Sequence, residues 1–199
     1  MRLVLDWDGT VTERDTLDLV LQAFGDPEIY ERVEAELDAG RMTLNDVIAA
    51  EFATVTVPLG EAVEYVVEHT RLRPGFAELA RARHPLVVSS GFRELIEPVL
   101  EREGVLGEVE LRANRVEDRP EGWRVHFRVA EPCDECGEPC KRGDLPEGEI
   151  VYAGDGHSDY CASLAADRVF AIGGLARWLD RRGVEHEPLT DFYALASEL

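Results

Sequence analysis

Lysine is almost absent from this sequence of 199 residues. Of the 21 basic residues only Lys141 is a lysine, and the others are arginine. A single compact ammonium in such a chain suggests a position that needs a point charge rather than a planar guanidinium. Basic residues are also few beside the 41 acidic ones, which gives a net charge of −20. An acidic surface repels nucleic-acid backbones and anionic lipids, so we expect neither nucleic acid nor a membrane as partner.

Long hydrophobic runs are missing as well. No apolar stretch approaches the roughly 20 residues that span a bilayer. The first residues enter the short apolar run Leu3–Leu5 instead of a signal or transit peptide. We therefore expect a cytoplasmic protein. There is no internal repeat and no low-complexity linker, and the length suits one sizeable core with or without a small insertion.

Apolar runs alternate with helical patterns over most of the chain. Strand-like runs are found at 3–6, 86–88, 150–153 and 169–172, helical patterns at 76–83, 93–103, 175–182 and 191–198, and a hairpin or short strands at 109–128. This alternation predicts an α/β fold with a doubly wound, mostly parallel, Rossmann-like sheet. In such sheets ligands bind beyond the carboxyl ends of the strands, so polar residues that follow apolar runs are the candidates for a site.

Between residues 16 and 72 the pattern is helical only. Helices are predicted near 16–24, 28–39, 43–54 and 59–70. We interpret this segment (16–72) as a small α-helical cap inserted into a core domain formed by residues 1–15 and 73–199.

Acidic and hydroxyl side chains follow three of the predicted strands. These are Asp6 with Asp8, Ser89, and Asp155 with Asp159. Carboxylates gathered at one sheet edge need a counter-ion, and Mg²⁺ is the hard cation that prefers oxygen ligands. The hydroxyl of Ser89 and the ammonium of Lys141 could hold phosphoryl oxygens. Catalysis of phosphoryl transfer depends mostly on such positioning and on electrostatic stabilisation.

The motifs resemble those of the haloacid dehalogenase superfamily. Asp6-Trp7-Asp8-Gly9-Thr10 is similar to its first motif, Val88-Ser89-Ser90-Gly91-Phe92 to the second motif of phosphoserine phosphatases, Lys141 to the third, and Gly154-Asp155-Gly156-His157-Ser158-Asp159 to the fourth. The resemblance implies a phosphatase in which Asp6 is the nucleophile and Asp8 the general acid and base. It also implies Mg²⁺ held by Asp6, the Asp8 carbonyl and Asp155, with Asp159 as ligand or support.

The same resemblance suggests which residues contact the substrate. We expect these to be Gly9, Thr10, Asp15, Ser90 and Gly91. Asp15 stands where phosphoserine phosphatases carry a substrate-contacting acid, although an N-cap of the first cap helix is an equal alternative. Four arginines could bind a substrate carboxylate, although arginines on helix surfaces are usually solvated: Arg32, Arg41, Arg71 and Arg73.

A cysteine cluster directly precedes Lys141. Cys133, Cys136 and Cys140 have the spacing C-x₂-C-x₃-C, which in a cytoplasmic enzyme suggests metal or redox chemistry. These three could form a structural Zn²⁺ site with Cys161 or a histidine as fourth ligand, or remain reduced thiols without metal. A bound metal would order the loop that carries Lys141.

The cysteines before the lysine also resemble two subgroups. These are the methionine-salvage enol-phosphate phosphatases and the phosphoethanolamine/phosphocholine phosphatases. We therefore expect a small phosphomonoester of one of these types as substrate, phosphoserine being the alternative. A phosphotransferase, or a non-catalytic metal-binding or regulatory module on the same fold, is a competing class, and the chain could be a monomer or a homodimer.

Overall fold

A seven-stranded sheet forms the centre of the molecule. The computed structural model describes all residues from Met1 to Leu199. The strands are β1 (Arg2–Leu5), β2 (Leu86–Phe92), β3 (Glu110–Glu117), β4 (Arg124–His126), β5 (Ile150–Gly154), β6 (Arg168–Ala171) and β7 (Glu187–Pro188). Their order is β4-β3-β2-β1-β5-β6-β7, and only β4 pairs antiparallel with its neighbour. The predicted doubly wound α/β sheet is confirmed.

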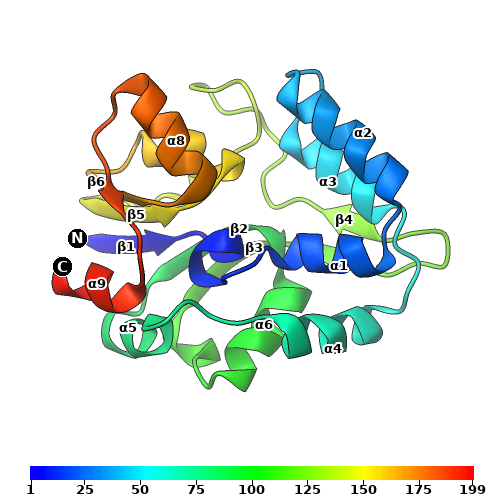
Figure 1. Cartoon of the computed structure of the whole chain (residues 1–199), viewed down its shortest axis with the longest axis horizontal. Helices are drawn as coiled ribbons and strands as arrows, with labels where there is room; N and C mark the ends of the chain where they lie inside the picture. Colours follow the sequence, from blue (N-terminus) through cyan, green and yellow to red (C-terminus); the bar gives the residue numbers. More distant parts are fainter.

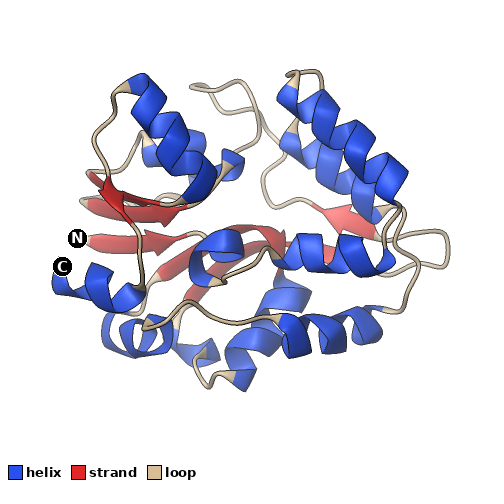
Figure 2. Ribbon diagram, in the orientation of Figure 1, coloured by secondary structure: helices blue, strands red, loops and turns tan.

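Helices cover both faces of the sheet, as Figures 1 and 2 show. Along β1, Leu3 and Leu5 point into the larger apolar core, whereas Val4 points into a second core on the opposite face. This alternation follows from the two-residue period of a strand. The larger core lies against α5 (Phe76–Arg83), α6 (Arg93–Arg102) and α9 (Phe192–Ser197), and the opposite face is covered by α7 (Tyr160–Ser163) and α8 (Gly173–Arg182).

Four helices occupy the segment for which a cap is predicted. They are α1 (Thr16–Phe24), α2 (Pro27–Asp38), α3 (Leu44–Phe52) and α4 (Leu59–His69). Local sequence sets their starts: Asp15 and Asp26 accept hydrogen bonds from the first turns of α1 and α2, and Thr43 forms a capping box with Asp46 in α3. The segment contains no strand.

These inserted helices share the larger apolar core with the sheet. Val20 of α1, Phe52 of α3 and Val66 of α4 belong to the same apolar cluster as the β-strand residues. The ring of Phe52 meets Phe92 edge-on at 4.6 Å and stacks on Trp123 at 5.9 Å. By contrast α2 buries a single side chain, that of Val33. Three of the four helices are therefore packed onto the core, and the domain division at residues 15 and 73 stays a prediction.

The ends of some elements differ from those predicted. β2 continues to Phe92, with an irregularity in its pairing between Val88 and Phe92, instead of ending before Ser89. The helix after β5 is reduced to the four residues of α7, because the turn at 157–159 occupies the preceding positions. The two-residue strand β7 carries no apolar run and was not predicted. None of the helices is long and apolar enough to cross a membrane.

Candidate active site

Lys141 links two of the predicted catalytic carboxylates. Its Nζ donates to Oδ1 of Asp6, the residue directly after β1, and to Oδ1 of Asp159 at 2.8 Å. Both Lys141 and Asp6 are only 2% exposed. Burial lowers the pKa of Lys141, but the carboxylates of Asp159 and Asp6 outweigh this effect and raise it, so the ammonium stays charged. The structure thus brings the first, third and fourth motifs together.

Asp159 is fully engaged in hydrogen bonds. Besides Lys141, the hydroxyl of Tyr152 donates to Oδ1 at 2.6 Å. The backbone N–H groups of Asp155 and Gly156 donate to Oδ2 at 2.9 and 3.1 Å. With two donors on each oxygen, this carboxylate fixes the ammonium and the turn after β5. Of its two predicted roles, this geometry favours support over direct metal ligation.

Asp8 is held between the start of α1 and strand β2. Its Oδ1 accepts hydrogen bonds from the backbone N–H of Thr16, at 2.8 Å, and from the Thr16 hydroxyl. Its Oδ2 accepts from Ser89 Oγ at 3.3 Å. Burial raises the pKa of Asp8, and the bonds from Thr16 and Ser89 oppose this rise. A buried carboxyl whose pKa is raised by burial and lowered by hydrogen bonds is suited to giving up and regaining a proton.

The donor set of the acidic centre fits Mg²⁺. Carboxylate oxygens of Asp6, Asp155 and Asp159 all lie within 4.8 Å of one another. Burial and the charge of Asp159 raise the pKa of Asp155 to about 7, and the same two causes raise that of Asp6. Lys141 is the single cation bonded to this group, so a hard divalent cation would relieve the remaining repulsion. Asp6 and Asp155 keep oxygens that are not hydrogen-bonded to the ammonium.

Backbone contacts hold the loop after β1 against this centre. A Cβ on Gly9 would lie 2.3 Å from Oδ2 of Asp155, and the φ angle of Gly9 is +72°, so only glycine fits. Thr10 Oγ1 donates to Asp6 Oδ2 at 3.2 Å. Arg73 donates through its guanidinium to the carbonyls of Thr10 and Gly9, at 2.8 Å each. Arg73 therefore orders the loop that follows Asp6, a role that no sequence signal indicated.

A cavity of about 210 Å³ opens above these residues, between the inserted helices and the sheet edge. Asp6, Asp8 and Asp155 lie at its base. Among the predicted substrate contacts, Asp15, Ser90 and Gly91 line the cavity. Gly9 and Thr10 do not, and Ser89 is fully buried below it. Oδ1 of Asp15 also caps α1, accepting from the N–H groups of Leu17 and Asp18. Asp15 is therefore the N-cap of α1 and also faces the cavity.

The inserted helices add further acids to the cavity wall. Asp18, Glu34 and Glu51 line it, and no arginine or lysine does. Glu51 is 5% exposed, and its Oε1 is buried without any hydrogen-bond partner. Burial, followed by the charges of Glu34 and Asp18, raises the pKa of Glu51 to about 8. The sequence did not single out these three acids, because helical spacing alone does not distinguish a cavity wall from a solvated surface.

Comparison with models of protein families shows to which family the chain belongs. Residues 3–163 match the family model for haloacid dehalogenase-like hydrolases, and this range contains all four motifs. The chain belongs to the haloacid dehalogenase-like hydrolases. This finding confirms the family predicted from the motifs.

Curated relatives and solved structures agree with this family. The chain is 27% identical over 212 residues to a 2-hydroxy-3-keto-5-methylthiopentenyl-1-phosphate phosphatase of Geobacillus kaustophilus (strain HTA426), covering 99% of this chain and 94% of the relative. It is 26% identical to the enzyme of the same name from Exiguobacterium sp. (strain ATCC BAA-1283 / AT1b), with coverage of 98% and 95%. These full-length matches identify this hydrolase as a phosphatase.

The solved structures show the same fold. A phospho-aspartyl intermediate analogue of phosphoserine phosphatase superposes with a TM-score of 0.72 at 15% identity, over 98% of this chain and 96% of that one. A phosphoserine phosphohydrolase-like protein from Francisella tularensis subsp. tularensis SCHU S4 gives a TM-score of 0.64 at 19% identity, over 100% and 99%.

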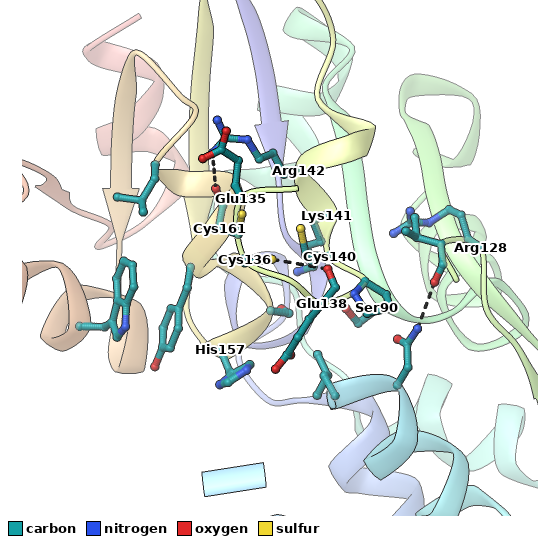
Figure 3. A pocket seen from close by; sticks show the side chains of 18 of the residues that line it. Ser90, Arg128, Glu135, Cys136, Glu138, Cys140, Lys141, Arg142, His157 and Cys161 are labelled. Atoms are coloured by element: carbon teal, nitrogen blue, oxygen red, sulfur yellow. Dashed lines mark hydrogen bonds between the residues drawn. The ribbon is translucent and has the colours of Figure 1, made fainter. Parts of the chain in front are cut away.

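Cysteines of the predicted cluster lie beside Lys141, as Cys136, Cys140 and Cys161 show in Figure 3. The structure adds Cys161, at the start of α7, to the three cysteines of the loop, and all four sulfur atoms lie within 4.8 Å of one another. The backbone N–H groups of Glu135 and Cys136 are hydrogen-bonded to the sulfur of Cys133 and lower the pKa of this thiol to about 7. Burial instead raises the pKa of Cys140 and, to about 11, that of Cys161. The grouping of four sulfur ligands is compatible with a bound metal.

Proposed function

We propose that this chain is a Mg²⁺-dependent phosphomonoester hydrolase that acts through a phosphorylated aspartate, Asp6. One observation carries the proposal: Lys141 lies between Asp6 and Asp159, while Asp8 is fixed beside them by Thr16 and Ser89. A non-catalytic or regulatory module would be expected to have lost one of these groups, and all of them are present.

In the first step, an oxygen of the Asp6 carboxylate attacks phosphorus and the ester P–O bond breaks. Asp8, protonated, gives its proton to the departing alkoxide oxygen. In the second step, Asp8 accepts a proton from water while the water oxygen attacks the same phosphorus. Inorganic phosphate leaves, and the Asp6 carboxylate is restored. Thr16 keeps Asp8 in one orientation for both proton transfers.

Mg²⁺, when bound, supplies positive charge that stabilises the transferring phosphoryl group and favours the ionised form of Asp6. Asp6, Asp155 and the Asp8 backbone carbonyl would hold it. Lys141 provides the second positive charge at the phosphoryl group, and Asp159 keeps its ammonium in place. The hydroxyl of Ser89 stays a predicted phosphoryl contact, although in this structure it serves Asp8.

The cavity wall favours a substrate with a cationic group. Beyond the phosphoryl position it presents Asp15, Asp18, Glu34 and Glu51, with the buried Oε1 of Glu51 lacking a partner. Asp18, Glu34 and Glu51 do not converge as ligand atoms of one metal ion would, which suits a larger organic cation better. We therefore favour an amino-alcohol phosphate of the phosphoethanolamine or phosphocholine type. Phosphoserine fits less well, because no arginine or lysine in the wall would receive its carboxylate.

The methionine-salvage enol-phosphate is the second candidate. Its support comes from the curated relatives, which are phosphatases of 2-hydroxy-3-keto-5-methylthiopentenyl-1-phosphate. The cavity also has apolar walls that could take a methylthio group, formed by Leu17, Leu21, Leu37, Leu44, Val47 and Ile48.

Phosphate release from a panel of phosphomonoesters tests the proposal. The panel contains phosphoethanolamine, phosphocholine, phosphoserine, the enol-phosphate and a neutral aryl phosphate, each with and without Mg²⁺. We expect Mg²⁺-dependent turnover that Asp6→Asn abolishes. Asp38→Asn, a change at an exposed residue of α2, is the matched control and should leave the rate unchanged.

The outcomes separate the chemistry from the choice of substrate. Highest kcat/KM for the two cationic esters would support the amino-alcohol phosphate, whereas preference for the enol-phosphate would select the second candidate. No turnover of any ester by folded protein with Mg²⁺ would refute the hydrolase. Transfer of phosphate to an added alcohol in place of water would instead indicate a phosphotransferase.

A further inference from the structure

A long irregular segment delivers the catalytic lysine. Between the end of β4 at His126 and the short turn Lys141–Asp144, residues 127–140 form neither helix nor strand. Segments of this length without regular structure are uncommon in compact domains and usually have a function or are disordered. Lys141, at the end of this segment, is nevertheless buried and bonded on two sides. Hydrogen bonds from Asn45 to the Val129 carbonyl and from the Arg128 N–H to Asn114 hold the first part of the segment, and the cysteines lie in the part that directly precedes Lys141.

The four cysteine sulfur atoms are close enough together to bind one metal ion. Cys133 and Cys136 lie on one tight turn, in which the N–H of Gly137 donates to the Cys133 carbonyl at 2.8 Å and Gly137 has a φ of +78°. Cys161 reaches this turn from α7, and its sulfur lies 3.9 Å from that of Cys133. Four sulfurs around Zn²⁺, at Zn–S bonds of about 2.3 Å, would be separated by about 3.8 Å. The distance between the sulfurs of Cys133 and Cys161 is close to this value and much longer than the roughly 2.05 Å of a disulfide.

We propose that Cys133, Cys136, Cys140 and Cys161 bind one structural Zn²⁺, which fixes the segment 127–140 and with it the position of Lys141. The four thiolates leave no open coordination position, as in structural zinc sites generally. Cys140 is adjacent to Lys141 in the chain, so the metal constrains the backbone one residue from the catalytic ammonium. Cys161 follows Asp159 by two positions, so the same metal also connects to the residue that holds this ammonium.

The surroundings suit a site of negative charge. Zn²⁺ with four thiolates carries a net charge of −2, and Arg142 lies beside it, with its guanidinium bonded to the Cys161 carbonyl at 3.4 Å. Arg128 and Arg182 line the adjoining cavity of about 460 Å³, whose wall includes Cys136, Cys140 and Cys161 (Figure 3). The zinc proposed here is separate from the acidic centre that suits Mg²⁺, because sulfur and carboxylate ligands select different metals.

Metal analysis of the full-length protein tests this proposal independently of turnover. The protein is purified without chelator, and its zinc content is measured by elemental mass spectrometry. We expect one zinc per chain, released by a mercurial reagent that attacks thiolates. After replacement by Co²⁺, we expect sulfur-to-cobalt charge-transfer bands and the strong visible bands of tetrahedral cobalt.

Variants locate the ligands. Cys161→Ser should reduce the zinc content to below about a tenth per chain and make the segment 127–140 more sensitive to protease, with a decrease in kcat of about tenfold. Two controls should keep full zinc content: Glu135→Gln, which removes an exposed acid beside the cysteines, and Asp155→Asn, which removes a carboxylate of the acidic centre.

Several results would overturn the proposal. The first is that the wild-type protein contains no zinc and binds none on reconstitution. The second is that an alkylating reagent modifies the four thiols equally with and without added Zn²⁺. The third is a Cys133–Cys161 disulfide found by peptide mass analysis. Iron in the cluster, seen by elemental analysis, would refute zinc as the metal. Because none of these measurements uses a substrate, their outcome does not depend on the proposed hydrolase activity.

Discussion

Oδ1 of Asp8 is bonded to both the backbone N–H and the hydroxyl of Thr16. Asp8 belongs to the loop after β1, whereas Thr16 is the first residue of α1, so this pair joins the sheet edge to the inserted helices. The proton-transfer group of the proposed mechanism therefore takes its orientation from the element that also forms the cavity wall.

Loss of the Thr16 hydroxyl should weaken catalysis and move its pH dependence. In Thr16→Val, Asp8 loses a hydrogen bond that favours its ionised form, so the pKa of Asp8 rises further and the pH profile of kcat shifts to higher pH. We expect kcat to fall roughly tenfold, the equivalent of one charge-assisted hydrogen bond. Thr70→Val is the matched control, because Thr70 is equally buried and its hydroxyl has no partner. An unshifted profile in Thr16→Val would contradict the role given to this contact.

Removal of the lysine should affect stability and turnover together. Lys141→Met leaves Asp6 and Asp159 buried beside each other without their shared cation. Breaking a buried pair in this way costs about 3–5 kcal/mol, and loss of a charge at the phosphoryl group lowers kcat by roughly 10²–10³. Thermal unfolding and steady-state kinetics measure the two effects. Added Mg²⁺ should restore part of the stability of the variant, and a variant as stable as wild type without Mg²⁺ would contradict the ion-pair argument.

Replacement of Glu51 by glutamine should stabilise the empty protein. The pKa of Glu51 is raised from 4.5 to about 8, so between these values the unfolded chain has lost a proton that the folded chain retains. Stability therefore falls as pH rises through this window, and the loss is complete above about pH 8. Glu51→Gln abolishes this loss, which amounts to on the order of 1 kcal/mol after allowance for solvent screening, or roughly 2–4 °C in Tm.

The increase in Tm of Glu51→Gln over wild type should be visible at alkaline pH and vanish at about pH 4. Glu61→Gln, at an exposed position of α4, serves as control and should change Tm at neither pH. If Glu51 binds the cationic end of the substrate, the same variant should lose tenfold or more in kcat/KM for phosphoethanolamine and keep its value for the neutral aryl phosphate. An equal loss for both esters would argue for a structural role of Glu51.

Mg²⁺ should stabilise the protein through the acidic centre. A ligand that binds only the folded state adds about 2.7 kcal/mol when its concentration is a hundred times its Kd. We expect Tm to rise with Mg²⁺, to return to its metal-free value with a chelator, and to respond much less in Asp155→Asn. Asp180→Asn, at an exposed residue of α8, should respond as wild type does. The measurement is a set of unfolding curves over a range of Mg²⁺ concentrations.

The sequence predicted that most of these site residues lie close together because of how parallel sheets are built. Asp6, Ser89 and Asp155 each follow an apolar run, and the neighbouring strands β1, β2 and β5 end at the same edge. The family motifs added Lys141, whose position no local pattern could give, because an irregular segment carries it to the site.

The sequence did not predict in which direction the acidic side chains of the helices point. Asp18, Glu34 and Glu51 have the spacing of ordinary surface acids, and only the packing of α1, α2 and α3 turns them toward one cavity. Two expected roles changed for similar reasons. Thr10 orients Asp6 from below instead of lining the cavity, and Arg73 uses its guanidinium on backbone carbonyls instead of a substrate carboxylate.

The unequal anchoring of the inserted helices has a consequence for the passage of molecules. α1, α3 and α4 share the apolar core with the sheet, whereas α2 buries only Val33. Elements with so little buried surface open at the lowest free energy. We therefore expect local opening of this one helix of 12 residues, more readily than movement of α1, α3 and α4, to admit substrate to the cavity.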